Sequence, residues 1–321
     1  MLSSYTLIEI LGQGGMGTVY RAHHQGLGID VAIKFYNKAT LGELGLEALA
    51  SEARVLSSIC HKNVARVYDY FEDQSNGYLV LELISGVTLQ DYVEKRGACP
   101  FLEAKPLLES LFETISFLHK HNPPIIVRDI KPENVMVVSP REVKLIDFGL
   151  ARVFDSTTNT KTSLKGFGSE GFAPIEQYGS GPTSPASDVY SACATAIYLL
   201  SGQRPPGAVD RVSQGVSLPP LAALNVSVPG DVCSALMQGA SIHPHDRLGL
   251  EEILGLFVSN QTTAFGSKAP VKSADLPSVK TVFSAVRKAP VVNVVMAVTV
   301  FFVVMMGMTI VAMFLSSLVA E

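Results

Sequence analysis

The stretch VRDIKPENV, residues 127–135, decides how the rest of this chain is interpreted. It brings a carboxylate, an ammonium group and an amide into one short run, at Asp129, Lys131 and Asn134. A carboxylate can accept the proton of a hydroxyl, an ammonium group can stabilise negative charge, and an amide oxygen can bind a cation. The run therefore predicts a reactive site, provided that matching parts stand elsewhere in the sequence.

A second carboxylate follows in KLIDFGLA, residues 144–151, where Asp147 precedes Phe148 and Gly149. An isolated Asp-Phe-Gly is more often a turn than a metal site. With Asn134, however, Asp147 offers two hard oxygen ligands, which suit Mg²⁺ when phosphate oxygens and water complete its shell. We therefore expect Asn134 and Asp147 to hold Mg²⁺, with Mn²⁺ as an alternative.

A glycine-rich run, GQGGMGTV, occupies residues 12–19, with glycines at Gly12, Gly14 and Gly17 followed by Val19. Glycine lets a backbone approach phosphate groups without a Cβ in the way. A plain hairpin turn or a dinucleotide-binding turn shows the same pattern. Two strand-like runs flank this one, and no acidic residue follows at the spacing that a dinucleotide site needs, so a phosphate-binding loop is favoured.

Lys34 ends the short β-prone run VAIK, residues 31–34. A lone strand lysine is commonly just exposed, but this one follows the glycine run closely and has apolar neighbours. An ammonium group held there could neutralise phosphate charge. Its expected anion is Glu52, at the edge of a helical stripe of apolar residues at 46, 49, 53, 56 and 60, with Glu47 as the nearest competitor.

The organisation of the chain predicts an α+β fold of two lobes. Residues 1–84 form a strand-rich lobe with one helix, and helical patterns dominate residues 86–258. Residues 259–290, rich in Ser, Thr, Lys, Ala and Pro, are expected to be a juxtamembrane linker. The periodicity of apolar residues thus predicts a small strand-rich lobe and a larger helical lobe.

The last part of the chain is uncharged from residue 291 to residue 320. A bilayer core needs a helix of roughly 20 apolar residues, whereas a buried core helix rarely holds so long an uncharged run. We therefore expect a transmembrane helix at 291–319. Because Arg287 and Lys288 stand just before it and only Glu321 after it, the preceding domain is expected on the cytoplasmic side of the cell (inner) membrane.

Overall composition excludes some classes of protein. The formal net charge is −4, which gives no overall basic field for nucleic acid. The four cysteines stand far apart without a C-x-x-C pair, which argues against a disulfide framework or a zinc site. The uncharged stretch has small residues but no G-x-x-x-G pair, so a homodimer formed through it is possible but is not specifically predicted.

At this point the chain resembles the eukaryotic-like Ser/Thr protein kinase family over roughly residues 5–257, closest in style to bacterial membrane-bound members. The run GSEGFAPIEQY, residues 168–178, resembles the end of that family's activation segment, although Pro174 and Ile175 stand where Ala and Pro are usual. The resemblance implies that Glu176 pairs with Arg247, and that a buried helix carries Asp188.

The resemblance implies a site for ATP with three catalytic residues, Asp129, Lys131 and Lys34, and with Leu81 as the gatekeeper of the adenine pocket. Backbone groups of Glu82 and Ile84 would bond the adenine. The residues implied for nucleotide binding are Leu11, Gly12, Gly14, Gly17, Val19, Ala32, Lys34, Glu52, Glu82, Ile84 and Met136.

Val127 departs from the family pattern, which usually has His or Tyr there. The residue is expected to support the loop by packing against Phe148, Leu56 and Val67, without touching phosphate. The implied function is a membrane-anchored kinase acting on Ser/Thr of protein substrates, itself included. A pseudokinase scaffold that binds nucleotide and a small-molecule kinase of related fold remain as alternatives.

Overall fold

A computed structural model describes residues 2–14, 17–147, 152–153, 169–178, 182–225 and 227–259, without the side chains at 41, 43, 44, 48, 52, 152, 153, 258 and 259. One compact unit comprises Met1–Ala264 and a second comprises Phe265–Glu321. The predicted transmembrane helix at 291–319 and nearly all of the predicted linker at 259–290 lie outside the described residues. Within the described residues, no helix is both long and apolar enough to cross a bilayer.

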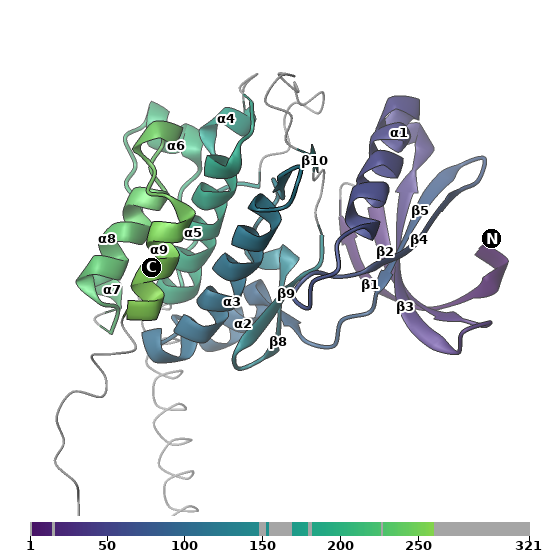
Figure 1. Cartoon of the computed structure of the whole chain (residues 1–321), viewed down its shortest axis with the longest axis horizontal. Coiled ribbons are helices and arrows are strands. Elements are labelled where there is room, and N and C mark those ends of the chain that lie inside the picture. The colour runs from purple at the N-terminus through teal and green to yellow at the C-terminus, as the bar shows by residue number, and fades with distance from the viewer. Residues whose placement is uncertain are drawn as a thin grey trace, which may run out of the picture. The chain divides into compact units, whose positions relative to one another are not determined.

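The first lobe is an antiparallel sheet with one helical element that is kinked at Gly42, where φ is 68° (Figure 1). Its strand order is β1-β2-β3-β5-β4. The bounds are β1(Tyr5–Gly14), β2(Gly17–His24), β3(Ile29–Asn37), β4(Val67–Glu72) and β5(Asn76–Glu82), with α1(Lys38–Ser57) between β3 and β4.

Helix α1 begins where the Asn37 side chain accepts a hydrogen bond of 2.8 Å from the Ala39 amide. Its inward side chains at 46, 49 and 53 pack against Tyr36 and Leu79 of the sheet. This confirms the predicted apolar stripe as far as Leu56, which is buried. The stripe was wrong at Cys60, which is exposed because the helix ends at Ser57.

The second lobe is largely helical and its core is built around α5(Pro185–Ser201), whose residues from Ser187 to Ser201 are all buried. Helices α3, α8 and α9 pack with it into one hydrophobic cluster (Figure 1). The helices of this lobe are α2(Leu89–Arg96), α3(Phe101–His119), α4(Ile175–Tyr178), α5, α6(Ala208–Ser213), α7(Leu221–Leu224), α8(Gly230–Gly239) and α9(Leu250–Ser259).

Short strands of this lobe flank the stretch at residues 127–135. They are β6(Val87–Thr88), β7(Ile125–Ile126), β8(Val135–Ser139), β9(Glu142–Leu145) and β10(Arg152–Val153). The loop at 127–134 runs from β7 to β8, and Asp147 follows β9 closely. Because β8 and β9 pair antiparallel, with Val135 opposite Leu145, the end of the loop at 127–134 lies near Asp147.

The two-lobed α+β fold is thereby confirmed.

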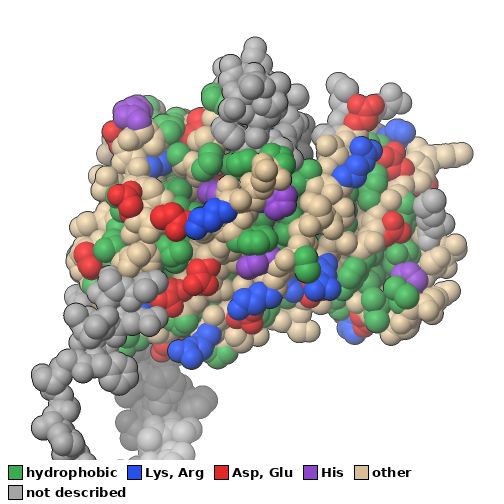
Figure 2. All heavy atoms as spheres, viewed as in Figure 1, with side chains coloured by type: hydrophobic (Ala, Val, Ile, Leu, Met, Phe, Trp, Pro, Cys, Tyr) green, Lys and Arg blue, Asp and Glu red, His purple; other side chains and the backbone are tan. Residues whose placement is uncertain are grey.

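Acidic and basic side chains are interspersed over the face shown in Figure 2, and hydrophobic side chains lie scattered between them. The split at residue 258 between a catalytic domain and a linker stays a prediction.

Candidate functional site

A buried aspartate fixes the backbone of the loop at 127–134. Asp188 on α5 is fully buried, and its two carboxylate oxygens accept hydrogen bonds from the amides of Val127 (2.9 Å) and Arg128 (2.8 Å). The His119 ring nitrogen lies 2.8 Å from the same carboxylate. Arg128 has a φ of 71°, a conformation that costs a non-glycine residue energy and therefore needs such anchoring.

The loop presents Asp129 at the centre of a hydrogen-bonded set. The Asn134 amide nitrogen donates to the Asp129 carboxylate and to its main-chain oxygen, each at 2.8 Å. The Lys131 ammonium group lies 2.9 Å from the same carboxylate. The Ser169 hydroxyl donates to the other carboxylate oxygen at 3.1 Å and accepts from Lys131 at 3.0 Å. The side chains of Asp129, Lys131 and Asn134 therefore converge.

Lys34 and Asp147 form an ion pair between the two lobes. Lys34 is only 7% exposed, and burial alone would lower the pKa of its ammonium group. The charge of Asp147 outweighs burial and, with Tyr36, raises that pKa above its ordinary value, so Lys34 stays charged. The predicted partner Glu52 lies on α1, but its side chain is outside the described ones, so that pairing stays a prediction.

The glycine run forms a hairpin between β1 and β2, in which Gly14 is paired with Gly17 and Gly12 with Val19. A strand rather than a helix follows the run, which excludes a dinucleotide-binding turn. A Cβ at Gly17 would come within 1.9 Å of the Phe35 carbonyl oxygen, so only glycine fits there. A Cβ at Gly12 or Gly14 would meet nothing within 4 Å, which leaves open space above the hairpin.

The residues proposed for adenine lie on both lobes. Ala32 on β3 is buried and pairs with Leu81 on β5. The Glu82 amide donates to the Arg66 main-chain oxygen at 2.9 Å, so the carbonyl is the group of Glu82 that could bond a ligand. The others are Leu11 and Val19 on β1 and β2, Ile84 after β5, and Met136 on β8.

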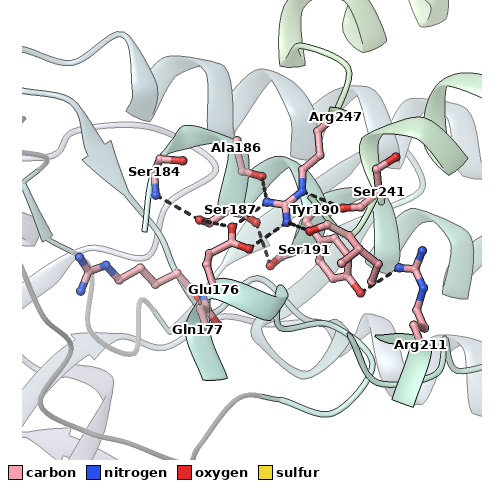
Figure 3. Close-up of polar contacts among 12 residues, drawn as sticks. Glu176, Gln177, Ser184, Ala186, Ser187, Tyr190, Ser191, Arg211, Ser241 and Arg247 are labelled. Atoms are coloured by element: carbon pink, nitrogen blue, oxygen red, sulfur yellow. Dashed lines mark hydrogen bonds and ion pairs between the residues drawn. The ribbon is translucent and has the colours of Figure 1, made fainter. Parts of the chain in front are cut away.

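Glu176 and Arg247 are paired as predicted (Figure 3). The guanidinium group reaches the two carboxylate oxygens at 2.7 and 2.9 Å, and it also donates to main-chain oxygens including that of Ala186. Burial would raise the pKa of Glu176, but hydrogen bonding and the charge of Arg247 hold it below its ordinary value. The pair fastens α4, and hence the segment that carries Ser169, to the start of α5.

The donor set fits a divalent cation held together with phosphate oxygens. Asn134 uses its amide nitrogen for Asp129, so the amide oxygen is the atom that could coordinate a cation, as could the Asp147 carboxylate. The described part of the chain has no cluster of three or more His, Cys, Asp or Glu that could hold a metal by itself. A cation here would therefore depend on ligands supplied by a bound nucleotide.

Sequence reasoning had not assigned site roles to two of these residues. His119 has no local motif that marks it, because it meets Asp188 only after α3 and α5 pack. Ser169 was included only as part of the run GSEGFAPIEQY, without a role of its own. The resemblance of that run to the end of an activation segment was a usable signal.

Comparisons with known proteins agree with this geometry. The family model described as protein kinase domain matches residues 5–218. The serine/threonine-protein kinase PrkC of Bacillus subtilis is 31% identical over 250 residues, covering 76% of this chain and 38% of its own length. PknA, a serine/threonine-protein kinase of Mycobacterium tuberculosis, is 32% identical over 225 residues, with 67% and 52% covered.

A plant protein, the SNF1-related protein kinase catalytic subunit alpha KIN12 of Arabidopsis thaliana, is 30% identical over 224 residues, covering 67% of this chain and 44% of its own length. The chain thus spans about half, or less, of the length of these curated relatives.

Proposed function

Because this chain belongs to the protein kinase domain family, we propose that it is an active serine/threonine kinase. It transfers the γ-phosphoryl group of ATP to hydroxyl groups of proteins, including its own, while anchored in the cell membrane. The observation that carries the proposal is the hydrogen-bonded set around Asp129. A scaffold that only bound nucleotide would not need a carboxylate held between an ammonium group and a hydroxyl.

Each polar residue of the site has a role in this reaction. Asp129 orients the acceptor hydroxyl and accepts its proton, and Lys131 stabilises negative charge on the phosphoryl group in transfer. Lys34 holds phosphate oxygens of the nucleotide. Asn134 and Asp147 would bind Mg²⁺, which neutralises phosphate charge when it is present. Ser169 keeps Asp129 and Lys131 in place from the opposite chain segment.

Transfer of labelled γ-phosphate tests the proposal directly. The purified chain with ATP and Mg²⁺ should label itself and a generic Ser/Thr protein substrate, and chelation of the metal should stop the labelling. Binding of nucleotide without label on any protein would instead favour the pseudokinase alternative. Label on a small molecule alone would favour a kinase of related fold with a non-protein substrate.

Val127→His should leave the rate of transfer within roughly tenfold of the original, because Val127 carries no charge that moves in the reaction. Its side chain is fully buried in the same cluster as Leu56, so a larger ring would cost about 1–3 kcal/mol of packing instead. Initial rates and thermal unfolding of the same samples separate the two effects. Activity gained only with His, from an inactive original, would contradict this role.

Self-modification is expected between Thr157 and Ser163, a run outside the described residues that contains Thr157, Thr158, Thr160, Thr162 and Ser163. A phosphate group there could pair with Arg128, next to Asp129, and order the segment. Mass spectrometry after incubation with ATP should find the modification in the original chain. The same run should stay unmodified in Asp129→Asn, and an unmodified run in the active protein would refute the prediction.

Anchoring through residues 291–319 should place the kinase domain in the cytoplasm, because Arg287 and Lys288 precede the uncharged stretch. The chain should sediment with membranes, whereas a chain that ends after Asn260 should be soluble and active. Protease added to intact spheroplasts should leave the domain uncut, with opened spheroplasts as the control. Digestion from outside, or a truncated chain still in the membrane pellet, would overturn this topology.

A further inference from the structure

A basic side chain, Arg204, is fastened beside the loop that carries Asp129. One terminal nitrogen of its guanidinium group donates to the Glu133 carboxylate at 3.1 Å. The other donates to the Glu170 main-chain oxygen at 3.1 Å. The guanidinium carbon lies 5.0 Å from the centre of the Phe172 ring, a distance at which a cation is attracted to an aromatic face. Three contacts, one from the loop of Glu133 and two from the segment 169–178, thus hold one arginine.

The contacts of Arg204 flank the place where an acceptor hydroxyl must sit. Glu133 belongs to the same loop as Asp129, and Glu170 directly follows Ser169, whose hydroxyl bonds Asp129. An extended peptide advances about 3.3 Å per residue. Side chains within a few residues of the acceptor therefore reach this position.

Without Arg204 the position would be acidic. One carboxylate oxygen of Glu133 accepts a hydrogen bond from Arg204, and the other is buried without a hydrogen-bond partner. A carboxylate close to an acceptor site would attract a basic residue of a peptide.

We propose that Arg204 is a specificity-determining residue that occupies an acidic subsite next to the acceptor and so disfavours peptides with a basic residue there. The inference rests on the proposed kinase function and adds the class of substrate to it. A basic peptide side chain would have to displace Arg204 from Glu133 or lie against its like charge. Neutral side chains meet neither obstacle, so the preferred sequences around the acceptor lack basic residues at the position that faces Glu133.

The test measures kcat/KM of the full-length chain for a neutral serine peptide and for a set of peptides with a single Arg at each position from four before to four after the serine. In the original chain no Arg should raise kcat/KM more than about threefold. In Arg204→Ala and Arg204→Gln, Arg at one or more positions should raise it at least tenfold over the neutral peptide. Adding Glu133→Gln to Arg204→Ala should remove that gain.

Arg96→Ala is the matched control. Arg96, at the end of α2, also pairs with a glutamate, Glu103 on α3, and also lies over an aromatic ring, that of Tyr92. The control should leave every ratio unchanged. Unchanged ratios in both Arg204 variants, a strong preference for Arg in the original chain, or loss of neutral-peptide activity in both variants would overturn the inference alone. Failure of the original chain to label any peptide would overturn the proposed function, and this inference with it.

Discussion

Asp129→Asn should lower kcat by at least about 10²-fold, because the amide cannot accept the proton of the acceptor hydroxyl. Lys34→Met and Asp147→Asn should each cause a loss of the same order, since each removes a charge positioned at the transferring phosphate. The three changes act on different roles: proton transfer, phosphate binding and cation binding. Retained activity in any two of them would refute the assignment of the site.

The measurement is initial-rate phosphoryl transfer at saturating ATP, together with nucleotide binding by the same proteins. Asp129→Asn should still bind nucleotide, because its carboxylate is bonded to Lys131, Asn134 and Ser169 rather than placed against phosphate. Two exposed residues supply matched controls. Lys62→Met removes a lysine that is 77% exposed, and Asp69→Asn changes an exposed aspartate on β4, so both should keep nearly full activity.

Glu176→Gln should destabilise the folded chain by about 3–5 kcal/mol, because it leaves the Arg247 guanidinium group buried without a compensating charge. Both side chains are almost fully buried, at 9% and 1% exposed. At about 2–4 °C per kcal/mol for a domain of this size, the melting temperature should fall by roughly 6–20 °C. Glu103→Gln is the matched control, because its pair with Arg96 is exposed and such pairs contribute about 0–1 kcal/mol.

The effect of Glu176→Gln should also depend on pH. The pKa of Glu176 is lowered in the folded chain, from an ordinary value of 4.5, so its stabilising contribution is complete above that value. It is lost as the pH falls through the lower, folded-state pKa. The difference in melting temperature between the original chain and Glu176→Gln should therefore be constant near neutral pH and shrink in acid. A difference that is small at neutral pH, or that grows in acid, would contradict the role given to the pair.

Much of the fold could be read from local sequence. Strand-like runs were predicted on both sides of the glycine run, and the hairpin of β1 and β2 confirms strands there. The apolar stripe from 46 to 56 predicted the inward face of α1. Both succeed because periodicity and glycine act over a few residues, within one element.

Local patterns failed where a partner comes from a distant segment. The ion pair of Lys34 with Asp147, which lies in the other lobe, was not predicted. Ser169 bonds Asp129 although 40 residues separate them along the chain. Spacing along the chain carries no information on such approaches.

By itself, therefore, the sequence determined the family, the two-lobed fold and the chemical types of residue at the site. It did so because each of these depends on short motifs whose order along the chain is fixed. Only the tertiary structure decided that Asp188, itself bonded to His119, accepts hydrogen bonds from the loop at 127–134. The same holds for the contact of Arg204 with Glu133 of that loop. The physical reason is that these contacts join separate helices and loops, and their distances are set by how the core packs.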